Sequence, residues 1–335
     1  MAAITIGTRS FRVPIFVPSI SSFETQLRPA SALRLQLTLR EPISLVSAYD
    51  VANDPELVEL CRAFRGQGVL LLDSGGYESS RILRYSSELN GKLWNYEKYA
   101  SIAANDIYDY IFSFDYFPIP QEPPKDFRER ILSSLRQHAN ILDIEKLIPV
   151  IHVQPKGSNV HRFSDNDLVD MFGYIAEQLE CPFISVPERE LGNGIIDRAN
   201  LARQISLRLR QCDSHLHVLG CGNLLSLSLL SVAGVTMCDG LEWCRTFAAD
   251  DFHLHHFQHK ELFADPDYYR RNPIAEYIFK ETQLDYPTQV AVRNLLSFQA
   301  FTDDIQNRLD KFSVNEFVRS YFGEVAGEAV RTLET

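Results

Sequence analysis

Residues 43–76 read ISLVSAYDVANDPELVELCRAFRGQGVLLLDSGG, and this stretch decides the fold class. It contains two short apolar runs, at 43–47 and 69–72, of the kind that form strands buried on both faces. Between the runs, apolar residues recur at the three-and-four spacing of a helix: Leu57, Leu60, Cys61 and Phe64. The stretch therefore predicts a strand, a helix and a second strand, which is the repeating unit of a parallel sheet.

The same alternation continues along the chain. Further apolar runs stand at residues 110–114 (YIFSF), 148–153 (IPVIHV), 183–186 (FISV), 216–219 (LHVL) and 235–238 (VTMC). These seven runs, with room for an eighth, predict an α/β fold with a (β/α)8 TIM barrel. We expect one domain over residues 1–335, with the barrel at about 40–260.

The end of the chain has helical spacing and no further strand run. Apolar residues between Val292 and Leu309 keep the three-and-four spacing, and Ser313 with Glu316 forms the sequence pattern of a capping box. A last helix is expected to follow this box. We therefore expect C-terminal helices at about 285–325.

The composition excludes several classes of protein. Of the 335 residues, 45% are hydrophobic and 23% charged, which is ordinary for a globular fold and rules out a disordered or collagen-like chain. A net charge of −11 does not suit a protein that coats nucleic acid, although a local basic groove remains open. Six cysteines without metal-ligand spacing indicate reduced thiols. With no signal-peptide pattern and no window of about 18 apolar residues, we expect a cytoplasmic protein without a membrane partner.

Polar side chains follow most of the predicted strands. They are Asp50, Asp73, Asp115, Gln154, Glu188 and Asp239. In a TIM barrel the C-terminal ends of the strands carry the active site, so these residues predict a pocket lined by carboxylates. The alternative for each aspartate is a turn or helix-capping role, which this residue type also favours.

Three segments carry more specific patterns. Residues 73–77 read DSGGY, and the two glycines let the backbone come close to a planar ligand or a phosphate. Residues 237–240 read MCDG and are followed by Arg245. The N-terminal segment 9–22 places an apolar IFV between two prolines.

In this order the motifs resemble those of the tRNA-guanine transglycosylase family, which exchanges bases in queuosine and archaeosine biosynthesis and has DNA-modifying relatives. Residues 73–78 are similar to the family's DSGG(F/Y)Q motif, and residues 114–115 to its FD motif. The family's GIQQGS, MGVG and FDCV…TR segments resemble residues 152–158, 219–222 and 238–245. The resemblance covers roughly residues 1–245 and again the last helices.

This resemblance implies a pentosyltransferase that replaces guanine in a nucleic acid, either tRNA or DNA, with a 7-deazaguanine base. A carboxylate attacks C1′ and expels guanine, and the incoming base then displaces the enzyme from the covalent glycosyl intermediate. By the resemblance, Asp239 is the nucleophile and Asp73 the general acid/base beside it. The resemblance implies no cofactor. It implies association with a second copy of the chain or with a partner subunit.

The resemblance also implies a set of substrate-binding residues. Asp115 would accept hydrogen bonds from N1–H and the 2-amino group of guanine, and Gln154 would reach the O6 edge. Tyr77 would stack on the base, and Arg245 would hold a phosphate. Glu188 and Glu190 are candidates to contact a cationic aminomethyl group on the incoming base. For Glu190 the alternative is exposure to solvent. The remaining residues assigned to the substrate are Ser74, Gly75, Gly76 and Gly222.

The sequence departs from the family after the nucleophile strand. No CxCxxC…His zinc motif follows Asp239, and residues 253–259 read HLHHFQH in its place. We therefore expect the zinc subdomain to be reduced or absent and no metal to be bound. The alternatives are that His255 and His259, one helical turn apart, bind a metal, or that the segment is a strand. Glu78 also stands where the family has Gln.

Two other functions remain open from the sequence. One is a non-catalytic transglycosylase-like subunit or nucleic-acid-binding partner, which would be free to lose either carboxylate. The other is a barrel hydrolase that cuts sugars with paired carboxylates. The presence of both Asp73 and Asp239 favours the exchange enzyme over the first, and the ordered motifs favour it over the second.

Overall fold

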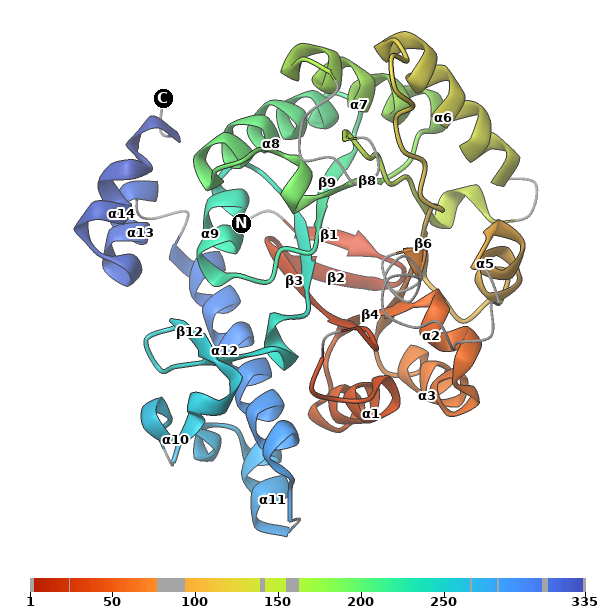
Figure 1. Ribbon diagram of the computed structural model, residues 1–335. Coiled ribbons are helices and arrows are strands. Elements are labelled where there is room, and N and C mark those ends of the chain that lie inside the picture. The colour runs from red at the N-terminus through yellow and green to blue at the C-terminus, as the bar shows by residue number, and fades with distance from the viewer. Residues whose placement is uncertain are drawn as a thin grey trace.

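The computed structural model describes residues 3–23, 25–76, 94–138, 142–154, 163–265, 267–281, 283–308 and 313–333. At its centre an eight-stranded parallel sheet curves into a nearly closed barrel (Figure 1). The strand order is β7-β6-β5-β4-β3-β10-β9-β8, and a bridge between Val150 and Ser185 joins the two edge strands. The predicted α/β fold with a TIM-type barrel is confirmed.

Seven of the eight barrel strands overlap the predicted apolar runs. The strands are β3 (Ile15–Ile20), β4 (Ile43–Ser47), β5 (Val69–Asp73), β6 (Tyr110–Phe112), β7 (Leu147–Ile148), β8 (Phe183–Pro187), β9 (His215–Leu219) and β10 (Met237–Gly240). The remaining strand, β3, comes first, so the barrel begins at Ile15 and not at about residue 40. Pro18 breaks the apolar pattern of β3, and its carbonyl oxygen accepts a hydrogen bond from Nε2 of Gln36 at 3.1 Å.

Helices follow the strands and surround the barrel (Figure 1). They are α1 (Pro29–Leu39), α2 (Ala48–Asn53), α3 (Pro55–Arg65), α5 (Tyr96–Ala103), α6 (Pro124–His138), α7 (Asp165–Leu179), α8 (Ile195–Arg210) and α9 (Leu224–Val232). Helix α3 shows why these segments are helical: Leu57, Cys61 and Phe64 form its buried face, and the side chain of Asp54 accepts the N–H of Glu56 at its start.

A hairpin of β1 (Ala3–Ile6) and β2 (Arg9–Arg12) closes the N-terminal end of the barrel. Ile6 is fully buried in the cluster that fills the barrel interior. At the turn of the hairpin, the Cβ position of Gly7 lies 3.2 Å from Oδ1 of Asp109, which directly precedes β6. The hairpin therefore lies at the end opposite to the strand ends that carry the candidate residues.

The chain after β10 packs against one side of the barrel (Figure 1). It comprises β11 (Thr246–Ala248), β12 (Leu254–His256), α10 (Lys260–Phe263), α11 (Pro273–Glu281), α12 (Tyr286–Arg308), α13 (Val314–Phe322) and α14 (Glu324–Ala329). The capping box predicted at Ser313 and Glu316 is present at the start of α13. Among the described residues, no helix is both long and apolar enough to cross a membrane.

Short 3-10 helices complete the fold. They are η1 (Ile144–Lys146), η2 (Glu188–Glu190), η3 (Glu242–Cys244), η4 (Phe257–His259), η5 (Tyr268–Arg271) and η6 (Arg331–Leu333). Two of them, η2 and η3, directly follow barrel strands, β8 and β10, and so place side chains at the candidate end.

Candidate active site

The interior of the barrel changes from apolar to polar toward the C-terminal strand ends. Its apolar layer includes Val17, Leu71 and Met237, all buried. Ser19, Asp73 and Asp239 each stand two positions further along the same strands. Because side chains alternate along a strand, these three point to the same interior as the apolar residues two positions before them and lie nearer the C-terminal ends of their strands. The barrel interior is therefore polar near the C-terminal strand ends and apolar below them.

Asp239 is buried and held by donors from both neighbouring strands. Oγ of Ser19, on β3, donates a hydrogen bond to its Oδ2 at 2.6 Å. The backbone N–H of Gly220, directly after β9, donates to its Oδ1 at 3.3 Å. Each carboxylate oxygen thus has a fixed donor, so the plane of the group is set before any ligand binds.

His217 is a residue of this site that the sequence reasoning did not select. It is fully buried on β9, in register with Met237, and its Nε2 lies 3.1 Å from Oδ1 of Asp239. Neither ring nitrogen of His217 has a hydrogen-bond partner among the described residues, so its contact with Asp239 is close without being a directed hydrogen bond. The ring packs on Phe112 with centroids 4.9 Å apart. The alternation of side chains along His215–Leu219 could have indicated that His217 points into the barrel interior.

Asp73 ends β5 and is half-buried at the same rim. Its Oδ2 accepts the N–H of Gly75 at 3.1 Å. Gly75 has φ +75, and a Cβ there would lie 2.6 Å from the backbone nitrogen of Tyr49, so only glycine fits. Strands β4 and β3 separate β5 from β10 in the sheet. Tyr77, the predicted stacking residue, lies outside the described residues.

Asp115 meets the DSGG segment from the neighbouring strand. Oγ of Ser74 donates to its Oδ2 at 3.2 Å. A Cβ on Gly76 would lie 1.8 Å from the same oxygen, so the carboxylate can come this close to the segment only because residue 76 has no side chain. The carbonyl oxygen of Ser74 accepts from Nε1 of Trp94 at 2.9 Å, which anchors the segment. The structure therefore brings together Ser74, Gly76 and Asp115, three residues that the resemblance assigns to substrate binding.

A buried histidine joins Asp115 to Glu190. Nε2 of His152 lies 3.1 Å from Oδ1 of Asp115, and its Nδ1 lies 2.9 Å from Oε1 of Glu190. Burial lowers the pKa of His152, but the hydrogen bonds to Asp115 and Glu190 outweigh it and raise the pKa to about 9. Of the two options for Glu190, solvent exposure is wrong, since its side chain is 4% exposed and paired with His152.

Gln154 stands two positions after His152, and Glu188 stands two positions before Glu190. Gln154 is buried, and its N–H donates to Oε2 of Glu190 at 3.2 Å. Glu188 is paired with Arg198, with 3.0 Å between Oε1 and Nη1. An aminomethyl group that binds Glu188 would therefore compete with the guanidinium of Arg198.

Gly222 and Arg245 follow β9 and β10. The Cβ position of Gly222 lies 2.3 Å from Cγ of Glu242, so the loop after β9 can come this close to η3 only because residue 222 is a glycine. Nη2 of Arg245 donates to the carbonyl oxygen of Phe23 at 3.0 Å, while its buried Nε has no hydrogen-bond partner among the described residues. Burial raises the pKa of Glu242, and Arg245 partly opposes this shift.

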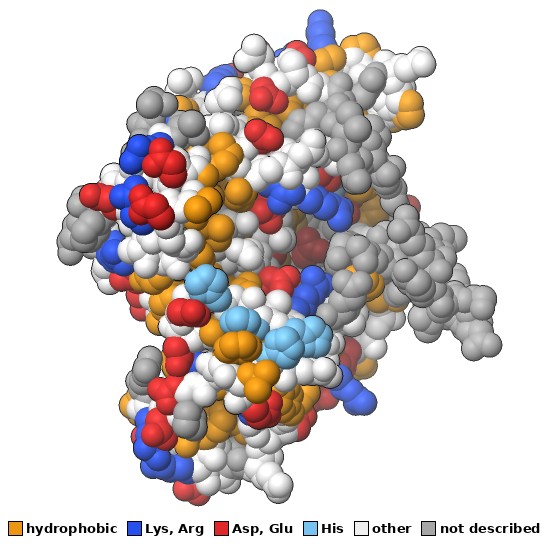
Figure 2. All heavy atoms as spheres, turned by 60° about the vertical axis from the view of Figure 1, so that its left-hand side comes forward, with side chains coloured by type: hydrophobic (Ala, Val, Ile, Leu, Met, Phe, Trp, Pro, Cys, Tyr) orange, Lys and Arg blue, Asp and Glu red, His pale blue; other side chains and the backbone are white. Residues whose placement is uncertain are grey.

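The histidine-rich segment does not form a metal centre in the part of the chain that is described. No group of three or more His, Cys, Asp or Glu side chains there is placed to hold an ion. His255 stacks on Phe263 with centroids 4.1 Å apart, and His256 lies on the strand β12. The surface histidines form the pale-blue group in Figure 2. The six cysteines, all of which are described, are unpaired.

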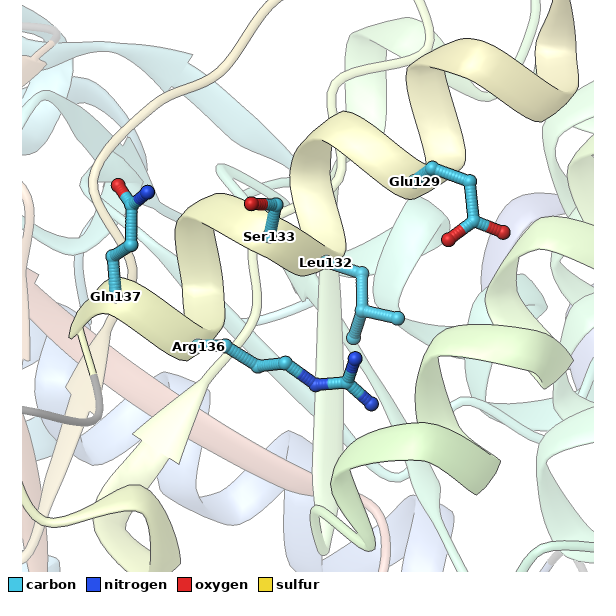
Figure 3. A pocket seen from close by; sticks show the side chains of 5 residues that line it. All are labelled: Glu129, Leu132, Ser133, Arg136 and Gln137. Carbon is cyan, nitrogen blue, oxygen red and sulfur yellow. The ribbon is translucent and has the colours of Figure 1, made fainter.

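A surface pocket of about 460 Å³ lies away from these residues (Figure 3). Its lining comes from α6 alone: Glu129, Leu132, Ser133, Arg136 and Gln137. Helix α6 lies outside the barrel, and none of these residues is a predicted site residue. The strand ends, and not this pocket, hold the candidate chemistry.

A scan against models of protein families and a search of curated proteins both find no match for this chain. The functional proposal below rests on the ordered motifs of the sequence and on the arrangement of side chains at the strand ends.

Proposed function

We propose that this protein is a base-exchange transglycosylase, a pentosyltransferase that replaces guanine in a nucleic acid with a 7-deazaguanine base. The observation that carries the proposal is the buried carboxylate of Asp239, held by Ser19 and Gly220 at the C-terminal end of the barrel. The fixed plane and the position at a strand end suit a nucleophile.

The exchange takes place in two displacements at C1′ of the target nucleotide. A carboxylate oxygen of Asp239 attacks C1′, the bond to N9 of guanine breaks, and the departing base takes a proton. The incoming base then loses its N9 proton, its N9 attacks C1′, and the ester bond to Asp239 breaks to release the carboxylate. Asp73 moves these protons as general acid and then as general base.

The base would lie over Asp115. This carboxylate is 19% exposed at the strand ends and offers acceptors to the N1–H and 2-amino group of guanine. Gln154 and Tyr77 complete the base site in this proposal, with Gln154 at the O6 edge and Tyr77 stacked on the ring. Arg245 and the glycines of the DSGG segment would contact the ribose-phosphate side.

A covalent intermediate is the direct test of this function. The whole chain is incubated with unmodified tRNA or duplex DNA and separated on a denaturing gel. The proposal predicts a protein–nucleic-acid adduct that disappears on adding guanine and that Asp239→Asn does not form. Absence of an adduct and of base exchange with both polymers, from folded protein, would favour a non-catalytic subunit.

A further inference from the structure

Three side chains from successive strand ends, here called the relay, contact one another in turn. Asp115 follows β6, His152 follows β7, and Glu190 ends η2 after β8. The ring nitrogens of His152 are 3.1 Å from the carboxylate of Asp115 and 2.9 Å from that of Glu190. The relay therefore links the proposed base site to a carboxylate inside the protein.

Glu190 anchors the inner end of the relay. Its Oε2 accepts the N–H groups of Val153 and Gln154 at 2.8 and 3.2 Å, and its Oε1 faces His152. With 4% of its side chain exposed, it has no contact to offer to a substrate. It serves to fix the orientation of the histidine ring.

The ring itself has only one arrangement available. Phe117 stacks on His152 with centroids 4.0 Å apart, and the side chain of His152 is 6% exposed. Because the two hydrogen bonds raise the pKa of His152 to about 9, the ring carries both protons at neutral pH and donates at both ends. A charge-assisted donor is stronger than a neutral one, so the bond to Asp115 is well defined.

Asp115 is the one member of the relay that reaches the surface of the barrel end. Its side chain is 19% exposed, against 6% for His152 and 4% for Glu190. His152 holds Oδ1 and Ser74 holds Oδ2, so the carboxylate plane is fixed from two directions. A fixed plane matters for a ligand that must place two N–H donors side by side.

We propose that His152 and Glu190 are positioning residues that fix the plane of Asp115 and thereby set the preference for guanine over hypoxanthine, the purine that lacks the 2-amino group. This inference rests on the proposed function. Without the relay, Asp115 rotates and keeps a single hydrogen bond to either base. The loss of the second bond removes the discrimination while leaving the attacking carboxylate of Asp239 untouched.

The test is equilibrium dialysis of radiolabelled guanine and hypoxanthine against the whole chain at pH 7. A hydrogen bond to a charged group implies a wild-type preference for guanine of about tenfold to hundredfold. His152→Phe keeps the ring and the stacking but removes both donors, and the preference should fall to about onefold. In Glu190→Gln the amide oxygen stays on the backbone N–H groups and the amide nitrogen faces Nδ1, so the ring becomes neutral and the preference falls severalfold.

His215→Phe is the matched control. His215 lies at the opposite end of β9, where its ring packs on Phe183, so this variant removes a histidine without touching the relay. Its preference should equal that of the wild type. Circular dichroism checks the fold of each variant, and Glu190→Gln carries the test if His152→Phe does not fold.

The outcomes separate the two proposals. A wild-type protein that prefers guanine, with the same preference in both relay variants, overturns the positioning role alone. A wild-type protein that binds neither base and exchanges none overturns the positioning role together with the proposed function. A loss of preference in the relay variants, with base exchange retained, supports both.

Discussion

Ser19 and Asp239 are 220 positions apart in the sequence, and Oγ of Ser19 donates a 2.6 Å hydrogen bond to Oδ2 of Asp239 inside the barrel. The contact exists because β3 and β10 are parallel neighbours, with Asp239 in register with Val17. It makes the first strand of the barrel part of the proposed catalytic site. The hydroxyl fixes one oxygen of the carboxylate while the N–H of Gly220 fixes the other.

Replacing Ser19 with alanine should slow base exchange while the fold survives. A hydrogen bond to a charged group contributes about 1.5–3 kcal/mol, so the rate should fall by about tenfold to hundredfold. Single-turnover base exchange measures the effect. Ser44→Ala is the control, since the hydroxyl of Ser44 is buried on β4 and has no hydrogen-bond partner among the described residues, so its loss should leave the rate unchanged. Equal rates in all three proteins would contradict a role for Ser19.

Gly76→Ala should weaken guanine binding. The new Cβ would stand 1.8 Å from Oδ2 of Asp115, so the carboxylate or the DSGG segment must move. Overpacking of this kind costs about 1–3 kcal/mol, which is about a tenfold loss of affinity or more. The control is Gly66→Ala, at the end of α3, where φ is −66 and the nearest atom is 3.4 Å away. That variant should bind guanine normally, and an unchanged affinity in Gly76→Ala would refute the packing argument.

The stability of the protein should fall as the pH rises from about 6.5 through about 9. The pKa of His152 is raised above its ordinary value of 6.5, so the folded state binds a proton that the unfolded chain releases in this range. The contribution is fully present below pH 6.5 and is lost above about 9, and it is on the order of 3 kcal/mol. Urea unfolding at several pH values measures it. His152→Phe should flatten this part of the profile, and an unchanged slope in the variant would contradict the relay.

Glu41 should produce a second fall in stability with rising pH, in a lower pH range than that of His152. It is buried between α1 and β4, where burial raises its pKa to about 7 against the opposing hydrogen bond from Gln299. The contribution of Glu41 to stability is therefore fully present below pH 4.5 and is lost as the pH rises to about 7. Glu41→Gln removes the titrating group and should raise stability at pH 8 by on the order of 3 kcal/mol. A variant no more stable than the wild type at pH 8 would show that the carboxyl is not strained by burial.

Most of the barrel was predictable because its strands are buried on both faces. The runs at 43–47 and 183–186 need no long-range information, since continuous apolar residues of that length suit a strand in a parallel sheet. The strand β3 was not predicted, and the start of the barrel was placed at about residue 40, because Pro18 breaks the apolar run of β3. The β7 strand is only Leu147–Ile148, shorter than the run at 148–153, and the remaining residues of that run lead into the relay.

The candidate site was predictable only where a motif is local. Asp73, Ser74 and Gly76 stand in one segment, and their common position with Asp115 follows from adjacent parallel strands. The partners of Asp239 were not predictable, since Ser19 and His217 reach it through strand register. For Glu190 the sequence left ligand contact and solvent exposure open, and neither option foresaw that η2 turns its side chain inward to His152.

The measurement that tests the central claim most directly is incorporation of radiolabelled guanine into purified tRNA and, in parallel, into duplex DNA. The wild-type chain and Asp239→Asn are compared, with circular dichroism to confirm that both are folded. The account predicts that label enters one of the two polymers with the wild type and enters neither with the variant. Equal incorporation by the variant would exclude Asp239 as the nucleophile, and no incorporation by the folded wild type into either polymer would contradict base exchange by this chain alone.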